Sequence, residues 1–361
     1  MEALPVTSLY QFLYHCDHFA ELTGRPQADL WSWKYAEPEA HLATYREIVR
    51  QVPFDLLQPQ PTPSREERAR TEFVVCGGAL LRRDRSDGRL APVAPVSGHA
   101  WDERANEVQT VFDERDARER ITVTRAEDLF AAGLNDYADA VVAAFGDDRF
   151  ILTGGVVGTL FSCSAYVGLT NLFALLLEQP ALIAYMSGRL LERNIEVIRQ
   201  LAAAGGDAIF VDDATATSDM ISVAHYERFS LPYVREMVRE IQRLGQKAIV
   251  IYFGGIADRL EQIASLGAEG LSMECSMKGY VNDIAEIAAA VGDRVSLFGN
   301  VDPVGVLQDG NDGLLCREVE RQVAAGRQAR GFILCTGSPI TPRTPLRRVQ
   351  RFLELGRSSR P

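Results

Sequence analysis

The strongest constraint on the fold is a repeated alternation of short apolar segments with longer amphipathic segments. The apolar segments lack a polar face, whereas the amphipathic segments have the 3.6-residue spacing of helices. Such a pattern predicts a parallel sheet that is buried on both faces by helices. The predicted strands are residues 54–57, 149–154, 207–211, 248–252, 270–273, 295–298 and 331–334, and the predicted helices are residues 182–204, 224–244, 257–266, 281–291, 313–325 and 345–355.

These seven strands fall one short of a closed eight-stranded barrel. The missing strand is less distinct, and Ile121-Thr122-Val123 is the candidate for it. No Gly-x-Gly-x-x-Gly sequence opens any helix of the series, which disfavours an open dinucleotide-binding sheet. We therefore predict an α/β fold in which residues 1–361 form a single (β/α)8 TIM barrel domain.

Two segments lie outside this alternation. Residues 1–53 are predicted to form N-terminal helices, because residues 40–52 have helical spacing and Pro53 then ends the helix. Residues 60–115 are rich in Arg, Asp, Glu, Gly and Pro, and they contain short apolar runs with a turn signal at Ser86-Asp87-Gly88. We interpret residues 60–115 as an inserted β-hairpin.

Charge and cysteine content narrow the functional classes. The formal net charge of −11 disfavours a nucleic-acid partner, and it disfavours a strongly polyanionic substrate unless arginines cluster locally. The six cysteines are scattered without a Cys-x-x-Cys pair, which is typical of reduced thiols in the cytoplasm. No apolar stretch reaches the roughly 18 residues of a membrane span. We expect a cytoplasmic protein with a small-molecule substrate and no membrane partner; a homodimer is left open.

Polar residues at the strand ends are the first functional candidates, because the active site of a barrel lies at the carboxyl ends of its strands. Asp212, Asp213 and Glu274 are predicted to be catalytic, since a buried carboxylate is costly without a partner or a role. Asn300 is predicted to belong to the same catalytic set, because its amide offers both a donor and an acceptor to a substrate. Asp302 is a candidate contact as well, although its position before a proline favours a helix cap.

Other strand-end positions are candidate substrate contacts. Tyr252 and Phe253 could stack on a flat ring, with packing inside the barrel as the alternative. Gly254 and Gly255 would let a ligand approach the backbone closely. Arg343, in the last loop, is the candidate contact for an anion. The remaining candidates are Thr153, Gly154, Thr215, Gly337 and Ser338.

Three motifs carry a resemblance to a known family. Residues 206–213, followed by His-Tyr-Glu-Arg-Phe-Ser-Leu-Pro-Tyr at residues 225–233, resemble the central segment of the uroporphyrinogen decarboxylase superfamily. Residues 297–303 resemble its Gly-Asn-x-Asp-Pro motif, and residues 331–345 resemble its C-terminal segment. The likeness covers residues 145–357 and, more loosely, residues 10–58. It implies a barrel with the active site at its mouth.

The resemblance implies one of two chemistries. Members of the superfamily either decarboxylate the acetate arms of uroporphyrinogen or transfer a methyl group between a cobamide on a corrinoid protein and a small acceptor. The C-terminal segment and the insertion are closer to the methyltransferase branch. Residues 9–18 also lack the arginines with which the decarboxylases hold substrate carboxylates.

The thiol-methylating branch uses zinc, whose ligands correspond to Ile251, Phe253 and Ser338 of this chain. None of these residues is a strong zinc ligand, so we expect neither zinc nor any other tightly bound cofactor. The resemblance therefore predicts a zinc-free methyltransferase-like enzyme that moves a methyl group between a corrinoid protein and an acceptor such as tetrahydrofolate. Two alternatives remain. One is decarboxylation of a carboxylated small molecule, and the other is a non-catalytic barrel that binds a ligand or a corrinoid protein.

Overall fold

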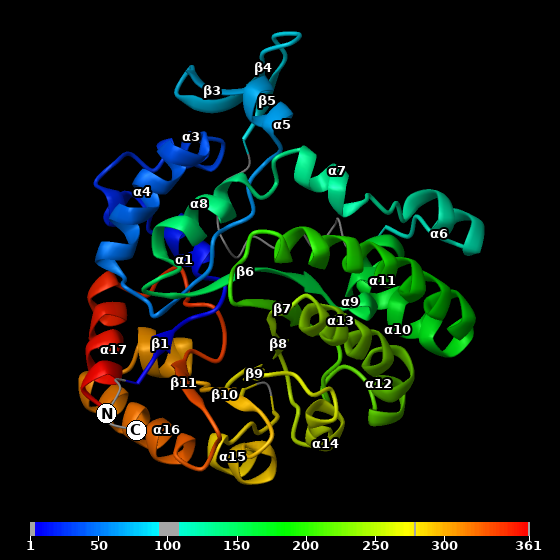
Figure 1. Ribbon diagram of the computed structural model, residues 1–361, viewed down its shortest axis with the longest axis vertical. Helices are drawn as coiled ribbons and strands as arrows, with labels where there is room; N and C mark the ends of the chain where they lie inside the picture. Colours follow the sequence, from blue (N-terminus) through cyan, green and yellow to red (C-terminus); the bar gives the residue numbers. More distant parts are fainter. Residues whose placement is uncertain (1–3, 94–107, 278, 360–361) are drawn as a thin grey trace.

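The fold was determined from a computed structural model, which describes residues 4–93, 108–277 and 279–359. Eight parallel strands form one sheet in the order β1-β11-β10-β9-β8-β7-β6-β2. They form a ring at the centre of the molecule, with α11 and α13–α17 around it (Figure 1). The strands are β1 (Val6–Thr7), β2 (Leu56–Leu57), β6 (Phe150–Val157), β7 (Ala208–Asp212), β8 (Lys247–Tyr252), β9 (Gly270–Met273), β10 (Ser296–Phe298) and β11 (Phe332–Cys335).

The barrel closes at a seam between β1 and β2. The backbone N–H of Asp55 donates to Val6 O at 3.0 Å, and the N–H of Val6 donates to Asp55 Oδ2 at 2.9 Å. The hydroxyl of Thr7 and the amide of Gln11 both donate to Leu56 O, at 3.2 and 2.6 Å. Side chains therefore complete a seam that backbone pairing alone would leave weak. The predicted (β/α)8 barrel is confirmed.

The eighth strand is not where the sequence indicated it. Residues 121–123 were predicted as this strand, but Ile121 ends helix α6 and its N–H donates to Ala117 O. The eighth strand is β1, inside the segment predicted to be helical. Its two residues pair with Leu334 and Cys335 of β11. Val6 and Thr7 lie between Pro5 and Ser8, which leaves no apolar run to detect, whereas the equally short β2 lies in the run Phe54-Asp55-Leu56-Leu57.

Helices surround the barrel. The predicted helix over residues 224–244 is interrupted at Ser230, which separates α12 from α13. The helices are α1 (Gln11–Asp17), α2 (Phe19–Thr23), α3 (Asp29–Lys34), α4 (Pro38–Gln51), α5 (Arg65–Arg70), α6 (Glu114–Arg120), α7 (Ala126–Ala131), α8 (Asp136–Phe145), α9 (Thr159–Val167), α10 (Leu169–Glu178), α11 (Pro180–Ala202), α12 (Val223–Phe229), α13 (Leu231–Arg243), α14 (Leu260–Ala264), α15 (Ile284–Val291), a π-helix (Pro303–Gln308), α16 (Asp312–Gly326) and α17 (Leu346–Ser358).

No single helix in the described ranges is long and apolar enough to cross a membrane. Only α9 and α10 taken together meet the length and composition of a span, and they are bent by 107° relative to each other.

The insertion forms a small antiparallel sheet that projects from the barrel (Figure 1). Its strands are β3 (Thr71–Cys76), β4 (Ala79–Asp84) and β5 (Leu90–Pro92). Gly77 and Gly78 join β3 to β4 with φ values of 58° and 81°, which favour glycine. The predicted hairpin thus gains a third strand beyond the turn at residues 86–88. Residues 94–107 of the predicted insertion lie outside the described residues.

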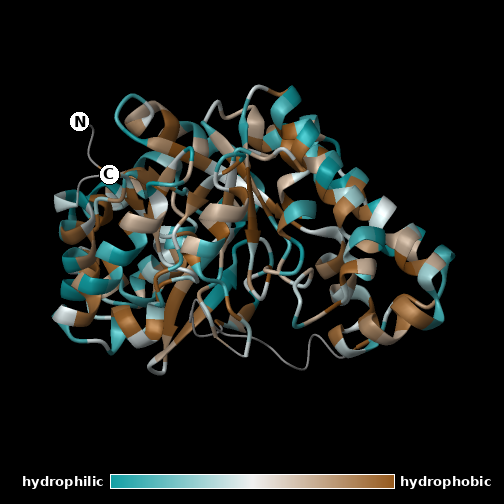
Figure 2. Cartoon of the chain, turned by 90° about the horizontal axis from the view of Figure 1, so that it is seen from below, coloured by the Kyte–Doolittle hydropathy of each residue, from teal (hydrophilic) through white to brown (hydrophobic). Residues whose placement is uncertain are grey.

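Side chains alternate between two apolar layers along each barrel strand. On β8, Ile249 and Ile251 face the barrel interior, whereas Ala248, Val250 and Tyr252 pack between the barrel and the helices. The strands are accordingly hydrophobic along their length (Figure 2). This alternation decides which residue at each strand end faces the barrel mouth.

Candidate active site

Three neighbouring strands direct polar or aromatic side chains into the barrel mouth. Asp212 follows the inward-facing Phe210 on β7, and Phe253 follows the inward-facing Ile251 on β8. Glu274 follows β9, whose residue Met273 packs in the outer layer, so Glu274 has the inward parity. Both carboxyl groups are buried, at 6% exposure for Asp212 and 4% for Glu274. The mouth therefore holds two carboxyl groups with an aromatic ring on the strand between them.

Tyr10 contacts Asp212 from the loop after β1. Its hydroxyl donates to Asp212 Oδ2, and its ring centroid lies 5.4 Å from that of Phe210 and 5.9 Å from that of Phe253. The φ of Tyr10 is 55°, the left-handed region that non-glycine residues seldom adopt. Gln58 Oε1 accepts a hydrogen bond from the Tyr10 N–H at 2.7 Å, which helps to hold this turn. The turn places the tyrosine ring over the barrel interior.

Glu274 is held in a similar way from the other side of the mouth. The Tyr280 hydroxyl donates to Glu274 Oε2, and the Ser338 hydroxyl donates to Oε1 at 3.0 Å. The backbone carbonyl of Glu274 accepts from the Asn282 and Asn300 amides at 2.9 and 3.2 Å. Each inward carboxyl group thus has a tyrosine hydroxyl as a hydrogen-bond donor.

Burial places the titration of two adjacent carboxyl groups near neutral pH. It raises the pKa of Asp212 to about 6, although the hydrogen bonds from Tyr10 and from the Ala214 backbone lower this pKa. Burial raises the pKa of Asp213 to about 7, against the lowering effect of a hydrogen bond from Ser230 at 2.5 Å. The charge of Asp212 raises the Asp213 pKa further. Groups that titrate in this range suit general acid–base chemistry.

Several buried side-chain oxygens after β6 and β7 have no hydrogen-bond partner among the described residues. Among the described residues, no partner is found for Asp213 Oδ1 or for the hydroxyls of Thr159, Thr215 and Thr217. Buried polar groups in proteins are nearly always paired with protein, ligand or ordered water. These side chains are at most 2% exposed, so an ordered water can satisfy their oxygens, and Thr215, a predicted contact, belongs to this buried group.

Asn300 and Asp302 have structural partners instead. The Asn300 amide donates to Asn282 O at 2.7 Å and accepts from Gln322 at 2.9 Å, so it braces the loop that carries Glu274. Asp302 Oδ1 accepts from the backbone N–H groups of Val304 and Gly305 at 2.8 and 3.0 Å. Asp302 is thus the cap of the π-helix, which was the favoured alternative.

Tyr252 and the two glycines after Phe253 pack against protein. The Tyr252 hydroxyl lies 2.9 Å from that of Tyr226 in the outer layer, so Tyr252 does not face the mouth. A Cβ atom on Gly254 would lie 2.4 Å from Thr217 Oγ1, and one on Gly255 would lie 2.9 Å from Tyr280 Cβ. These glycines admit neighbouring loops, not a ligand.

Thr153 and Gly154 lie within a strand, not at its end. The sequence placed the end of this strand at residue 154, but β6 continues to Val157. A bulge between Leu152 and Gly154 uses the glycines, and the Thr153 hydroxyl donates to Ala208 O at 3.2 Å. The glycine pair resembled a strand end because glycine also marks bulges.

Gly337 and Arg343 are the last two of the predicted substrate contacts. A Cβ atom on Gly337 would lie 2.4 Å from Cys275 N, so this glycine lets the loops after β9 and β11 approach each other. Arg343 is exposed, and no ion pair joins it to any residue in the described ranges. Its side chain remains available to an anionic group.

Residues that the sequence did not suggest support the site. Tyr10 and Tyr280 lie in loops, and Ser230 caps the start of α13. Arg259 is fully buried, and it donates to Ala216 O at 2.9 Å and to Ile221 O at 2.8 Å, which secures the loop after β7. Nothing in the sequence around these residues distinguishes them from ordinary loop or helix positions.

The positions that match the zinc ligands of the superfamily do not fit a metal. Ile251 packs in the barrel interior, Phe253 contacts Tyr10, and the Ser338 hydroxyl donates to Glu274. Within the described ranges, no three His, Cys, Asp or Glu side chains are grouped to hold a metal ion. These three positions therefore provide no zinc ligands.

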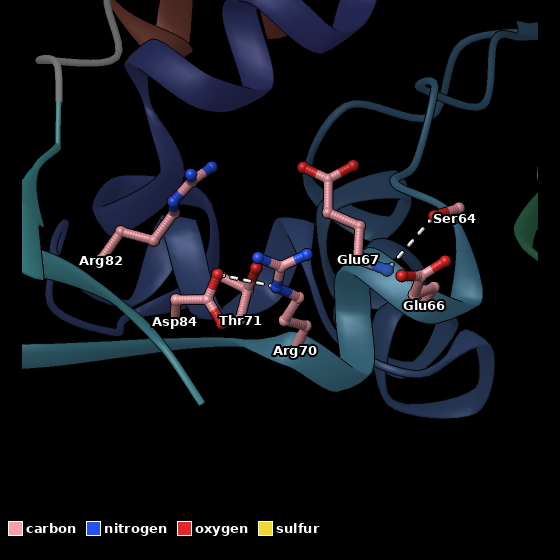
Figure 3. A pocket seen from close by; sticks show the side chains of 7 residues that line it. All are labelled: Ser64, Glu66, Glu67, Arg70, Thr71, Arg82 and Asp84. Atoms are coloured by element: carbon pink, nitrogen blue, oxygen red, sulfur yellow. Dashed lines mark hydrogen bonds and ion pairs between the residues drawn. The ribbon is translucent and has the colours of Figure 1, made fainter. Parts of the chain in front are cut away.

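A separate polar pocket of about 240 Å³ lies at the base of the insertion (Figure 3). Two of its charged groups form an ion pair, in which Arg70 Nε donates to Asp84 at 2.7 Å, and Ser64 Oγ accepts from the Glu67 N–H at 3.2 Å. We interpret it as the polar contact between α5 and the inserted sheet. The lining residues are Ser64, Glu66, Glu67, Arg70, Thr71, Arg82 and Asp84.

An eight-stranded barrel with paired carboxyl groups at its mouth is the arrangement of a TIM-barrel enzyme. The model of the uroporphyrinogen decarboxylase (URO-D) family matches residues 109–358, and the chain belongs to this family. The predicted family resemblance is confirmed.

Individual relatives agree with this assignment. The chain is 28% identical over 214 residues to uroporphyrinogen decarboxylase 2, chloroplastic, of Arabidopsis thaliana, covering 57% of the chain and 52% of the relative. It is 32% identical over 186 residues to uroporphyrinogen decarboxylase of Pseudomonas paraeruginosa, covering 50% and 49%. The chain thus spans about half the length of the curated relatives it matches.

Among solved structures, a methyltransferase from Methanosarcina mazei has the same fold. It superposes with a TM-score of 0.68 at 17% identity, over 99% of this chain and 94% of that one. This likeness shows the shared barrel fold.

Proposed function

We propose that the protein is a methyltransferase that takes a methyl group from a corrinoid protein and passes it to a nitrogen of a flat heterocycle such as tetrahydrofolate. The observation that carries this proposal is the pair of inward carboxyl groups, Asp212 and Glu274, with Phe253 on the strand between them. Carboxyl groups accept hydrogen bonds from ring N–H donors, and an aromatic side chain stacks on a flat ring.

The step requires one proton acceptor. The acceptor nitrogen forms a bond to the methyl carbon, the cobalt–carbon bond breaks, and its electron pair stays with cobalt. The proton that the nitrogen loses passes to a carboxylate, and Asp212 is mostly ionised above its pKa of about 6. Glu274, fixed by Tyr280 and Ser338, orients the ring. The corrinoid protein and the acceptor are substrates that the mouth would bind in turn.

Decarboxylation of a carboxylated small molecule is the second candidate. The sequence relatives are decarboxylases, and Asp213, with a pKa of about 7, could donate a proton to a developing carbanion. A substrate with several carboxylates needs cationic partners. Neither Asp212 nor Asp213 has an ion-paired Lys or Arg among the described residues, so Arg343 of the last loop is the candidate cation for such a substrate.

The test is incubation of the protein with methylcobalamin, which stands in for the corrinoid protein, and tetrahydrofolate. We expect the methyl–cobalt(III) absorption band to decline, and to decline at least 100-fold more slowly with Asp212→Asn. Uroporphyrinogen, incubated without oxygen, should release no carbon dioxide. Persistence of the methyl–cobalt band with every pterin or thiol acceptor would reject methyl transfer. Release of carbon dioxide would favour the second candidate.

A cytoplasmic location is part of the same proposal. The cysteines form no disulfide among the described residues, and four of the six are buried, as expected in a reducing compartment.

A further inference from the structure

A second cavity lies at the end of the barrel opposite the mouth. It has a volume of about 250 Å³ and opens between the first residues of β6, β8, β9 and β10 and the start of β11. We call it the floor pocket. It is lined by Phe150, Lys247, Ile249, Glu269, Gly270, Ser296, Phe298, Arg330 and Ile333. None of these residues belongs to the candidate active site.

The inner wall of the floor pocket is apolar. Ile249 and Phe298 belong to the cluster that fills the barrel interior, and Phe150 and Ile333 pack against it. A Cβ atom on Gly270 would lie 2.9 Å from Phe298 Cε2, so the glycine allows the phenyl ring to lie across β9. The wall can therefore bury a small apolar group.

The rim of the floor pocket carries two cations without ionic partners. The ammonium of Lys247 lies 6.0 Å from the centroid of the Phe150 ring. Arg330 Nη1 donates to a backbone carbonyl, Arg294 O, at 3.0 Å. Neither Lys247 nor Arg330 forms an ion pair with a described residue.

The one acidic residue of the lining, Glu269, offsets only part of this positive charge. Glu269 Oε2 accepts from the Ala248 N–H at 2.8 Å, and Oε1 accepts from the Gln242 amide at 3.0 Å. Both carboxylate oxygens are thus engaged in connecting β9 to β8 and α13. Two cations and one carboxylate leave a net charge of +1 at the rim above an apolar wall, and this combination favours an anion with an apolar body.

We propose that the floor pocket binds a small monocarboxylic acid, with its apolar body inside the barrel and its carboxylate between Lys247 and Arg330. The volume of about 250 Å³ corresponds to roughly eight water-sized groups at ~30 Å³ each. A ligand such as an arylacetate matches this size. The inference is independent of the chemistry at the mouth.

The probe for the test is phenylacetate, with 2-phenylethanol as the uncharged analogue, titrated into the full-length protein by calorimetry. Phenylacetate should bind with 1:1 stoichiometry, and 2-phenylethanol should bind about 10-fold more weakly. Affinity for phenylacetate should fall as salt is added, because the rim charges are exposed to solvent. Equal affinity for the acid and the alcohol, or no binding of either, would overturn the proposal.

Variants locate the binding. The double variant Lys247→Gln with Arg330→Gln should weaken phenylacetate binding at least 10-fold, since both changes lie at the exposed rim. Arg239→Gln, which removes one positive charge from the exposed face of α13, should leave the affinity unchanged. Ile333→Trp should abolish binding by filling the cavity.

The mouth provides the opposing control. Asp212→Asn should bind phenylacetate as the unmodified protein does. If Asp212→Asn abolished binding while the rim variant preserved it, the acid would be bound at the mouth and the proposal would be wrong.

Discussion

The mouth and the floor of the barrel are built by the same strands, yet their chemistry is opposite. At the mouth, buried carboxyl groups receive hydrogen bonds from Tyr10 and Tyr280. At the floor, apolar side chains lie beneath the solvent-exposed charges of Lys247 and Arg330. The difference arises from the loops, because those after β1 and β9 fold back over the mouth and supply donors. A buried carboxyl group is tolerated only where a loop brings it such a partner.

The largest effect should come from removing the carboxylate that accepts the proton. Asp212→Asn preserves the shape of the side chain but cannot take up a proton, so we expect turnover to fall 10²- to 10⁴-fold. The measurement is single-turnover loss of the methyl–cobalt band. Binding of phenylacetate at the floor should not change in the same variant. A fall of less than tenfold would show that another group accepts the proton.

The next prediction compares how variants at the mouth and at the floor change the pH dependence of the free energy of unfolding. Burial raises the folded-state pKa of Asp213 to about 7, above the ordinary carboxyl value of the unfolded chain. Protonated Asp213 therefore stabilises the fold below pH 4, and this contribution is lost as pH rises through about 7. Asp213→Asn should remove on the order of 2–4 kcal/mol of this pH dependence, measured by urea unfolding between pH 4 and pH 8.

Exposed charges at the floor provide the control for this measurement. The Lys247→Gln with Arg330→Gln variant should keep the full pH dependence of the unmodified protein. An unchanged pH dependence in Asp213→Asn would mean that Asp213 titrates normally.

A smaller effect should follow from removing one hydroxyl at the mouth. The hydrogen bond from Tyr10 lowers the pKa of Asp212, so Tyr10→Phe should raise that pKa above about 6. The acid limb of the pH–rate profile should move to higher pH, and the rate at pH 7 should fall about tenfold, or roughly 1.4 kcal/mol. Tyr14→Phe, which removes a tyrosine hydroxyl that donates to the Thr344 carbonyl and not to a carboxyl group, should leave the profile in place.

The smallest expected effect concerns the exposed cation of the last loop. Arg343→Gln should change the free energy of unfolding by less than about 0.5 kcal/mol, because the side chain is exposed and unpaired among the described residues. The effect of Arg343→Gln on KM distinguishes a carboxylated substrate from an uncharged one. A carboxylated substrate would show a several-fold higher KM in this variant, whereas an uncharged ring would not.

The sequence predicted the barrel well because seven strands are continuous apolar runs. It missed β1, because Val6 and Thr7 lie between Pro5 and Ser8 and form no apolar run, so only their pairing with Leu334 and Cys335 defines the strand. It also misjudged Tyr252, because a strand buried on both faces shows no polar–apolar alternation to reveal which side chains face inward.

The mouth was predictable only in part. Asp212, Asp213 and Glu274 follow strands directly and were found on that basis. Their donors were not, because Tyr10 reaches Asp212 across 202 residues and loop conformation decides the contact. Asn300 has the donor and acceptor that a substrate contact needs, but its amide forms hydrogen bonds with Asn282 and Gln322. These partners are far from Asn300 in the sequence, so only the folded structure shows them.

The seam of the barrel has a consequence for how the protein is made. Val6 pairs with Leu334, and the neighbouring hydroxyls of Ser8 and Thr336 meet across 328 residues. A ribosome adding 5–20 residues per second needs roughly 15–70 s to synthesise that interval. During this interval β1 has been synthesised but β11, the strand with which it pairs, has not. Closure is therefore a late event of biosynthesis, and the nascent chain must keep its amino-terminal edge from pairing elsewhere until then.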